Sequence, residues 1–142
     1  MGLVSRKNPP PQCYPAHHTN HAKAWPHHAL LGSEVTRLID TAALERALEE
    51  FAKARDWEQF HSPKNLAMAL TGEVGELVEL FQWLTEAQSR DAMKDTAQAQ
   101  RIREEMADVM LYLVRMASVL GVNLDVAVRD KLVKNALRYP AS

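Results

Sequence analysis

Two pairs of acidic residues have a spacing at which they could bind a metal ion together. Glu73 and Glu76 are three residues apart, and so are Glu105 and Asp108. Residues three apart lie on the same face of an α-helix, so each pair would present two carboxylates in one direction. Carboxylate oxygens are ligands that suit Mg²⁺ and Mn²⁺. The sequence therefore predicts a metal site built from two helices, with Mg²⁺ as the expected ion and Mn²⁺ as a possible substitute.

Both pairs lie in segments that otherwise carry apolar side chains. Glu73 falls within a stripe of heptad spacing, and Asp108 lies in a segment that is apolar on nearly every side. An ionised carboxylate in an apolar core is costly, so each must be paired, protonated or bound to a cation. For Glu76 and Glu105, the alternative is a solvated position on an outer face. The stripe around Glu73 comprises Leu66, Leu70, Leu77, Leu80 and Leu84.

Gly72 and Gly75 flank the first acidic pair. Each glycine inside a helix costs about 1 kcal/mol relative to alanine. We therefore expect another backbone or a ligand to approach the helix closely at this place.

Four amphipathic segments would position these residues. Nothing in residues 34–142 alternates between apolar and polar side chains as a strand would, so we expect an all-α fold, a four-helix bundle. A bundle of this size buries a limited core, so oligomerisation would help it. The expected helices run from about Thr41 to Arg55, from Pro63 (capped by Ser62) to about Glu86, from about Thr96 to Leu120 (closed by Gly121), and from a cap at Asn123 to before Pro140.

The third of these helices has the spacing of a buried stripe. The residues that we expect to face the core are Ile102, Met106, Val109, Leu113, Met116 and Leu120.

Residues 1–33 differ in composition from the rest and are expected to form a disordered tail outside the 34–142 domain. They hold five of the seven prolines and five of the six histidines, and the first acidic residue is Glu34. No apolar periodicity is present, so this segment should not pack a core. The histidines are His17, His18, His21, His27 and His28, and metal binding by them is the less favoured alternative because no carboxylate or helix accompanies them.

Charge and cysteine usage exclude several function classes. The net charge of −1 gives no strong basic field for nucleic acid or for an anionic membrane surface. A single cysteine, Cys13, excludes an internal disulfide and favours a cytoplasmic setting. A ferritin-type iron oxidase would need Glu-x-x-His pairs on its helices. His61 is the one histidine outside the tail and precedes the second expected helix, so this class is excluded for lack of ligands.

The acidic pairs and their flanking segments resemble the MazG-like nucleotide pyrophosphohydrolases, whose pattern is ExxE followed by ExxD on two helices. Here the pattern reads EVGE at 73–76 and EMAD at 105–108. The segments RDWEQFH at 55–61, ELFQW at 79–83 and NALRYP at 135–140 are similar to the dCTP pyrophosphatase branch of that family. The resemblance covers about residues 42–140.

This resemblance implies a Mg²⁺-dependent hydrolase that cleaves a nucleoside triphosphate, dCTP or a modified dCTP, between the α- and β-phosphates. The products would be the monophosphate and pyrophosphate. Family members are all-α and assemble as tetramers, each a pair of tightly packed dimers. A carboxylate that is not fully used in ligation can take the proton of the attacking water, and Glu76 or Glu73 is our candidate for this role. The resemblance implies that Glu73, Glu76, Glu105 and Asp108 hold magnesium. It gives substrate contacts to Trp57, His61, Trp83, Tyr112, Lys131, Asn135 and Arg138.

The sequence leaves two other hypotheses about the function open. One is a non-catalytic helical dimerisation module in which the carboxylates hold a structural cation. The other keeps the fold and changes the nucleotide, as in the all-α dUTPases that act on dUTP or in the phosphoribosyl-ATP pyrophosphohydrolases. Animal members of the dCTP pyrophosphatase branch carry a histidine where Leu48 stands here, so the preferred base stays open.

Overall fold

The computed structural model describes residues 37–140, and every regular element in that range is helical. The expectation of an all-α fold is therefore confirmed for the described part of the chain. The predicted tail, residues 1–33, lies outside it. The elements in order are α2 (Ala42–Lys53), η1 (Glu58–Phe60), α3 (Pro63–Glu79), α4 (Glu86–Arg90), η2 (Ala92–Lys94), α5 (Thr96–Leu120) and α6 (Leu124–Arg138).

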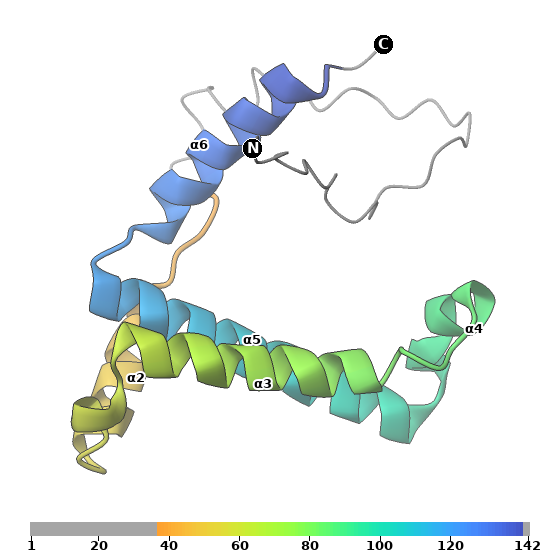
Figure 1. The fold of residues 1–142 in the computed structure, drawn as a ribbon, viewed down its shortest axis with the longest axis horizontal. Coiled ribbons are helices and arrows are strands. Elements are labelled where there is room, and N and C mark those ends of the chain that lie inside the picture. Colours follow the sequence, from red (N-terminus) through yellow and green to blue (C-terminus); the bar gives the residue numbers. More distant parts are fainter. Residues whose placement is uncertain (1–36, 141–142) are drawn as a thin grey trace, which may run out of the picture.

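Helices α3 and α5 lie side by side in opposite directions and form the centre of the molecule (Figure 1). A hydrogen bond between their segments stands near each end of the pair. At one end the Gln98 side chain donates to the Leu80 carbonyl, at 3.3 Å. At the other, the Nε of Arg115 donates to Nδ1 of His61, at 3.1 Å. The two bonds therefore join the segments at opposite ends of the pair.

The buried core follows the contact between α3 and α5. Leu66 on α3 and Val114 on α5 are its largest fully buried side chains. Helix α2 also packs against α5 and contributes the buried Ala52. Small side chains at Ala99 and Ala117 allow the helices to approach closely. A short row of α5 residues therefore receives most of the packing within one chain.

The helix starts and the end of α5 agree with the expected capping residues. The Ser62 hydroxyl accepts from the Asn65 amide at 3.2 Å, and Pro63 occupies the first turn of α3. Asn123 caps α6 in the same manner. Gly121 ends α5 in the left-handed conformation, with φ 66°, which a glycine adopts without strain.

The predicted end of the second helix was wrong. We expected it near Glu86, but α3 ends at Glu79 and a tight turn follows. Phe81 and Leu84 leave the helical path to pack against a buried cluster of Leu80, Ala92 and Ile102. Thr85 then starts a new helix with a complete capping box, in which its side chain and that of Gln88 bond to each other's backbone amides. Burial of the two apolar side chains and the new cap together outweigh continuation of α3.

Helix α6 turns away from the rest of the molecule. Its axis is bent by 102° from that of α5, and in Figure 1 it extends away from the α3–α5 pair. It makes only weak contacts with the other described elements. One side chain ties it to the start of the described chain: Asp125 accepts from the Leu38 amide at 2.6 Å and from the Ile39 amide at 3.0 Å.

Half of the stripe that we expected to be buried on α5 is exposed in the single chain. Ile102 is buried, whereas Met106, Leu113 and Leu120 are 58%, 36% and 54% exposed. Within the described residues only α3 and α2 cover α5 among the longer helices, so the far side of α5 has no neighbour. The expected burial of Met106, Leu113 and Leu120 is therefore wrong for the described part of the chain.

The two glycines beside the acidic pair also face open space. A Cβ added to Gly72 or Gly75 would meet nothing within 4 Å in the described residues. The expected close approach of a backbone is therefore wrong for the described part of the chain.

No single described helix is long and apolar enough to cross a membrane. The bent pair α5 and α6 meets the length and composition limits when the two helices are taken together.

Candidate metal centre

Three of the four predicted carboxylates form one cluster between α3 and α5. Glu73, Glu76 and Glu105 each place a carboxylate oxygen so that the three oxygens lie within 4.8 Å of one another. Glu73 and Glu105 are half-buried, and Glu76 is exposed. None of the three forms an ion pair with a lysine or arginine in the described residues. The cluster therefore concentrates negative charge without an ion-pair partner in the described residues.

Burial and this negative charge both shift the pKa values of two members of the cluster. Burial raises the pKa of Glu73, and the charges of Asp108, Glu76 and Glu105 raise it further. Burial also raises the pKa of Glu105, together with the charges of Glu76 and Asp108, while Arg101 opposes them. Each shift means that adding a negative charge here is unfavourable. A bound divalent cation would reverse this effect.

Asp108 lies beside this cluster rather than among its three closest oxygens. It is half-buried on α5, one turn after Glu105, and its charge acts on both Glu73 and Glu105. Tyr112 follows one turn later on the same helix and is also half-buried. The four carboxylates thus stand together as expected, and a hard cation that prefers oxygen ligands fits this donor set.

A turn after α2 positions Trp57. Asp56 adopts a left-handed conformation with φ 57°, and the Trp57 amide donates back to the Ala52 carbonyl at 2.9 Å. This arrangement is the usual helix stop, with an aspartate where glycine is more common. The Trp57 ring is 45% exposed and lies edge-on to Phe51, with the ring centroids 5.8 Å apart. It therefore presents an aromatic surface near the start of α3.

His61 follows Trp57 at the same end of the α3–α5 pair. The two ring centroids are 6.5 Å apart, and the His61 ring is half-buried. Its Nδ1 accepts the hydrogen bond from Arg115 on α5. Burial lowers the pKa of His61, the charge of Arg115 lowers it further, and Glu58 opposes both. Arg115 was not among the predicted site residues, although it continues the series Glu105, Asp108 and Tyr112 at intervals of three and four residues.

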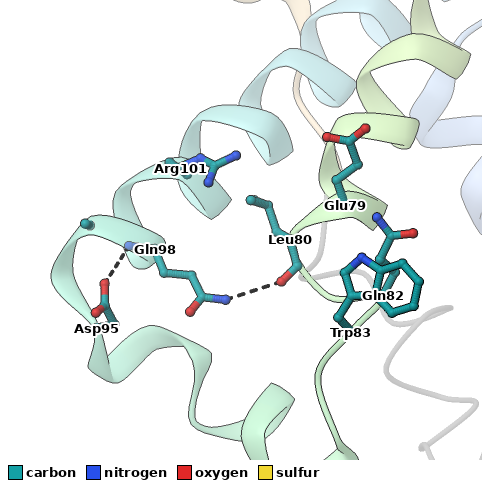
Figure 2. A pocket seen from close by; sticks show the side chains of 8 residues that line it. Glu79, Leu80, Gln82, Trp83, Asp95, Gln98 and Arg101 are labelled. Carbon is teal, nitrogen blue, oxygen red and sulfur yellow. Dashed lines mark hydrogen bonds between the residues drawn. The ribbon is translucent and has the colours of Figure 1, made fainter.

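Trp83 lies at the other end of the pair. Helix α3 has 17 residues and separates Trp83 from Trp57 and His61 by roughly 25 Å of helix. Trp83 is 87% exposed and borders a cleft of about 560 Å³. Figure 2 shows Glu79, Gln82 and Trp83 on one side of this cleft and Gln98 and Arg101 of α5 on the other. Within one chain, the aromatic residues expected in one pocket are therefore not together.

The three polar residues expected to reach phosphates lie on α6. Lys131 and Arg138 are exposed, Asn135 is half-buried, and the Arg138 guanidinium lies 5.4 Å from the Tyr139 ring centroid. Because α6 is bent away from α5, a single chain does not bring these side chains to the carboxylate cluster in this structure.

Comparison with known proteins agrees with the carboxylate pattern. The model of the MazG-like family matches residues 69–142, which include both acidic pairs. The chain is 47% identical over 98 residues to dCTP pyrophosphatase 1 of Homo sapiens, an alignment that covers 69% of this chain and 58% of that protein. For dCTP pyrophosphatase 1 of Rattus norvegicus the identity is 46% over 97 residues, covering 68% of this chain and 57% of that protein. The chain thus spans less than two thirds of the length of these curated relatives.

A solved structure shares the arrangement of helices. A pyrophosphatase from Archaeoglobus fulgidus superimposes with a TM-score of 0.66 and 36% sequence identity. The match covers 70% of this chain and 91% of that one.

Proposed function

The chain belongs to the MazG-like family, and from this premise we propose that it is a Mg²⁺-dependent nucleoside triphosphate pyrophosphohydrolase. The proposed reaction cleaves a deoxynucleoside triphosphate between the α- and β-phosphates and yields the monophosphate and pyrophosphate. The relatives named dCTP pyrophosphatase 1 favour dCTP, or a modified dCTP, as the substrate. The observation that carries the proposal is the cluster of Glu73, Glu76 and Glu105 between α3 and α5.

The charge of that cluster supports a metal-dependent reaction. A nucleoside triphosphate is itself strongly negative, so it would be repelled by these carboxylates; burial and the neighbouring acidic charges already raise the pKa values of Glu73 and Glu105. Mg²⁺ would supply positive charge that offsets the phosphates and would make water a better nucleophile. Glu73, Glu76, Glu105 and Asp108 would hold it, and Mn²⁺ would suit the same oxygen ligands.

Glu76 is our preferred proton acceptor, with Glu73 as the alternative. A general base must reach the water that attacks phosphorus, and a carboxylate can take its proton. Glu76 is the exposed member of the cluster, so it is open to water and to substrate. Glu73 is half-buried among apolar neighbours and is better suited to holding the cation.

The nucleoside would bind beyond Asp108, toward the end of the pair that carries Trp57 and His61. Tyr112 lies between the carboxylates and that end of α5. The exposed ring of Trp57 offers a face on which a base can stack. Lys131, Asn135 and Arg138 would contact the phosphates, where positive charge stabilises the leaving pyrophosphate.

A complete pocket of this kind requires more than one copy of the chain. Trp83 lies a helix length from Trp57 and His61, and α6 extends away from its own carboxylate cluster. A second copy in the opposite direction would bring its Trp83 end to the Trp57 end of the first. Exposed apolar residues on α5 would be covered by the same contact. We therefore propose self-association as a homotetramer, a dimer of dimers, with no nucleic-acid or membrane partner.

The proposal is tested by incubating the protein with a panel of canonical and modified nucleoside triphosphates and resolving the products. Each reaction is run with Mg²⁺, with Mn²⁺ and with chelator. We expect monophosphate and pyrophosphate, with a preference for dCTP or a modified dCTP and with no turnover in chelator. A preference for dUTP would change the substrate within the same fold. Metal binding without any released pyrophosphate would favour a non-catalytic dimerisation module.

A further inference from the structure

Arg115 is the one charged side chain that is buried among the described residues, with 8% of its surface exposed. No carboxylate of the described residues lies within ion-pair distance of it. Its Nε instead donates to Nδ1 of His61, at 3.1 Å. A buried guanidinium that bonds a neutral ring nitrogen is an expensive way to join two elements, because a charge has lost water without gaining an opposite charge. The described contacts of the Arg115 side chain therefore centre on its hydrogen bond to His61.

The direction of that hydrogen bond determines where the His61 proton resides. The arginine Nε–H can only donate, so Nδ1 of His61 must accept and carries no proton. A neutral imidazole has one protonated nitrogen, and here it must be Nε2. The far edge of the ring therefore presents a hydrogen-bond donor.

The charges around the ring favour its neutral form. Burial lowers the pKa of His61, and Arg115 on α5 lowers it further. Glu58, on the 3₁₀ turn before it, acts in the opposite direction. Together these effects lower the pKa of His61, which favours the neutral ring.

The position of this pair relates it to the carboxylates. Glu105, Asp108, Tyr112 and Arg115 follow one another at intervals of three, four and three residues, so they share one face of α5. The helical rise places Arg115 about 10 Å beyond Asp108 along that face. The Trp57 ring stands beside His61, with the centroids 6.5 Å apart. A nucleotide with its phosphates at the carboxylates would direct its sugar and base toward His61.

We propose that Arg115 is a positioning residue that holds His61 as the neutral tautomer protonated at Nε2, so that His61 donates a hydrogen bond to an acceptor oxygen or nitrogen of the substrate's nucleoside. This inference rests on the proposed function for its nucleoside part. The group of the nucleoside that His61 contacts would be a hydrogen-bond acceptor on the sugar or the base. A neutral donor adds no charge that would attract phosphate, so His61 discriminates between nucleosides rather than between phosphate chains.

The first experiment observes the tautomer in the wild-type protein. The full-length protein is labelled with ¹⁵N, and the imidazole nitrogens of His61 are observed by NMR, with a His61→Gln sample to assign them among the six histidines. We expect a protonated Nε2, an unprotonated Nδ1, and a midpoint of titration below 6.5. A ring protonated at Nδ1, or one charged at pH 7, would overturn the proposal.

The second experiment separates the hydrogen bond from the charge. Arg115→Gln keeps an N–H donor and removes the charge, whereas Arg115→Met removes both. We expect Arg115→Met to release the tautomer and to raise KM for dCTP roughly 2- to 10-fold, the effect of one hydrogen bond, with little change in kcat. Arg115→Gln should retain the tautomer and a KM near that of the wild type, although the His61 midpoint rises. Arg103→Met, at an exposed position of the same helix, is the control and should change neither quantity.

Substitution of His61 itself checks which ring edge is used. A glutamine amide nitrogen reaches about the position of Nε2, and an asparagine amide nitrogen reaches that of Nδ1. We expect His61→Gln to retain more of kcat/KM than His61→Asn. The reverse order would contradict donation from Nε2, as would Arg115 variants that change stability without changing the tautomer. If no nucleotide is hydrolysed although the Nε2 tautomer is present, the proposed function and the nucleoside contact both fail, and the link between Arg115 and the His61 tautomer remains.

Discussion

Glu73 occupies a position in the leucine stripe of α3 where an apolar side chain would be expected. The neighbouring carboxylates account for an acidic residue at this place. Its carboxylate stands with those of Glu76 and Glu105, and its pKa is raised by burial and by the charges around it. A side chain under this repulsion destabilises the metal-free fold. A bound cation, as proposed above, would convert this repulsion into favourable ligation.

Replacing Glu76 with glutamine should separate catalysis from folding. We expect Glu76→Gln to lower turnover by about 10²–10⁴-fold, the range for loss of a general base. The metal-free protein should be as stable as the wild type or more stable, because one repelling charge is gone. The increase in melting temperature that Mg²⁺ gives the wild type should become smaller. Thermal melts with and without Mg²⁺, together with a turnover assay, measure all three.

Glu79→Gln provides the control for that experiment, since Glu79 is exposed on the same helix and lies outside the three-carboxylate cluster. It should leave the Mg²⁺-dependent increase in melting temperature unchanged. If Glu76→Gln were instead unstable without metal, the carboxylate would be half of a structural ion pair, whose loss is strongly destabilising. Normal turnover by Glu76→Gln would also contradict the assignment.

The sequence predicted the carboxylate cluster because two acidic pairs interrupted two apolar stripes, and this signal is local to each helix. It did not predict the part played by Arg115. A buried arginine looks like an exposed one in a sequence, and its bond to His61 joins residues 54 positions apart. Its only local signal was the continuation of the Glu105, Asp108 and Tyr112 series.

At the scale of helices, the starts of α3, α5 and α6 were predictable because capping chemistry is local. The Ser62, Asp95 and Asn123 side chains each accept from a backbone amide three residues on. The end of α3 at Glu79 was not, since it depends on Phe81 and Leu84 packing against a cluster that includes Ile102 of α5. Apolar spacing alone continues past that point. Tertiary burial decided where the helix ended.

The orientation of α6 depends on Asp125, and this leads to a pH-dependent prediction. Asp125 accepts from the Leu38 and Ile39 amides and from Arg129, and these hydrogen bonds, with Arg129 first, lower its pKa. A lowered pKa contributes stability above the unfolded value near 3.8, and this contribution is lost as the pH falls through the folded value. Asp125→Asn should lower the melting temperature by a few degrees at pH 7. The difference should decrease progressively as the pH falls below the unfolded value, as followed by circular dichroism.

Asp130→Asn is the matched control, because Asp130 is exposed on the same helix. It should leave the melting temperature unchanged at pH 7. An equal effect of both variants would mean that the negative charge of α6, rather than the hydrogen bonds of Asp125, stabilises the structure.

At the scale of the whole molecule, the single chain leaves an apolar stripe of α5 uncovered. Met106, Met110 and Leu113 share one face and are 58%, 40% and 36% exposed. Monomeric soluble proteins rarely expose large apolar patches, and such a patch usually marks an interaction site. The heptad spacing of α5 predicted burial for Met106 and Leu113, and the described part of the chain leaves both exposed, because the spacing marks an apolar face without showing what covers it.

We expect Met110→Asp to weaken self-association, because it places a charge in the centre of this stripe. Sedimentation of the wild type at micromolar concentration should give a tetramer, and the variant should shift toward smaller species with reduced turnover. Arg103→Asp adds the same side chain at an exposed position of α5 and should sediment like the wild type. A monomeric wild type that turns over normally would contradict the shared pocket.

The tail offers a prediction about domain limits. We propose that residues 34–142 form the functional domain and that residues 1–33 lie outside it, because the tail has no acidic residue and no apolar periodicity. Deleting residues 1–33 should leave the melting temperature, the assembly and kcat/KM close to those of the full chain. A large loss of melting temperature, assembly or kcat/KM would mean that the tail belongs to the functional domain.

The position of bond cleavage tests the central claim most directly. The protein is incubated with dCTP and Mg²⁺ in ¹⁸O-labelled water, and the products are resolved by ³¹P NMR and mass spectrometry. Attack at the α-phosphorus predicts dCMP that carries one ¹⁸O atom, together with unlabelled pyrophosphate, and no reaction when Mg²⁺ is chelated. Formation of dCDP and labelled orthophosphate would contradict the account, because water would then attack the γ-phosphorus.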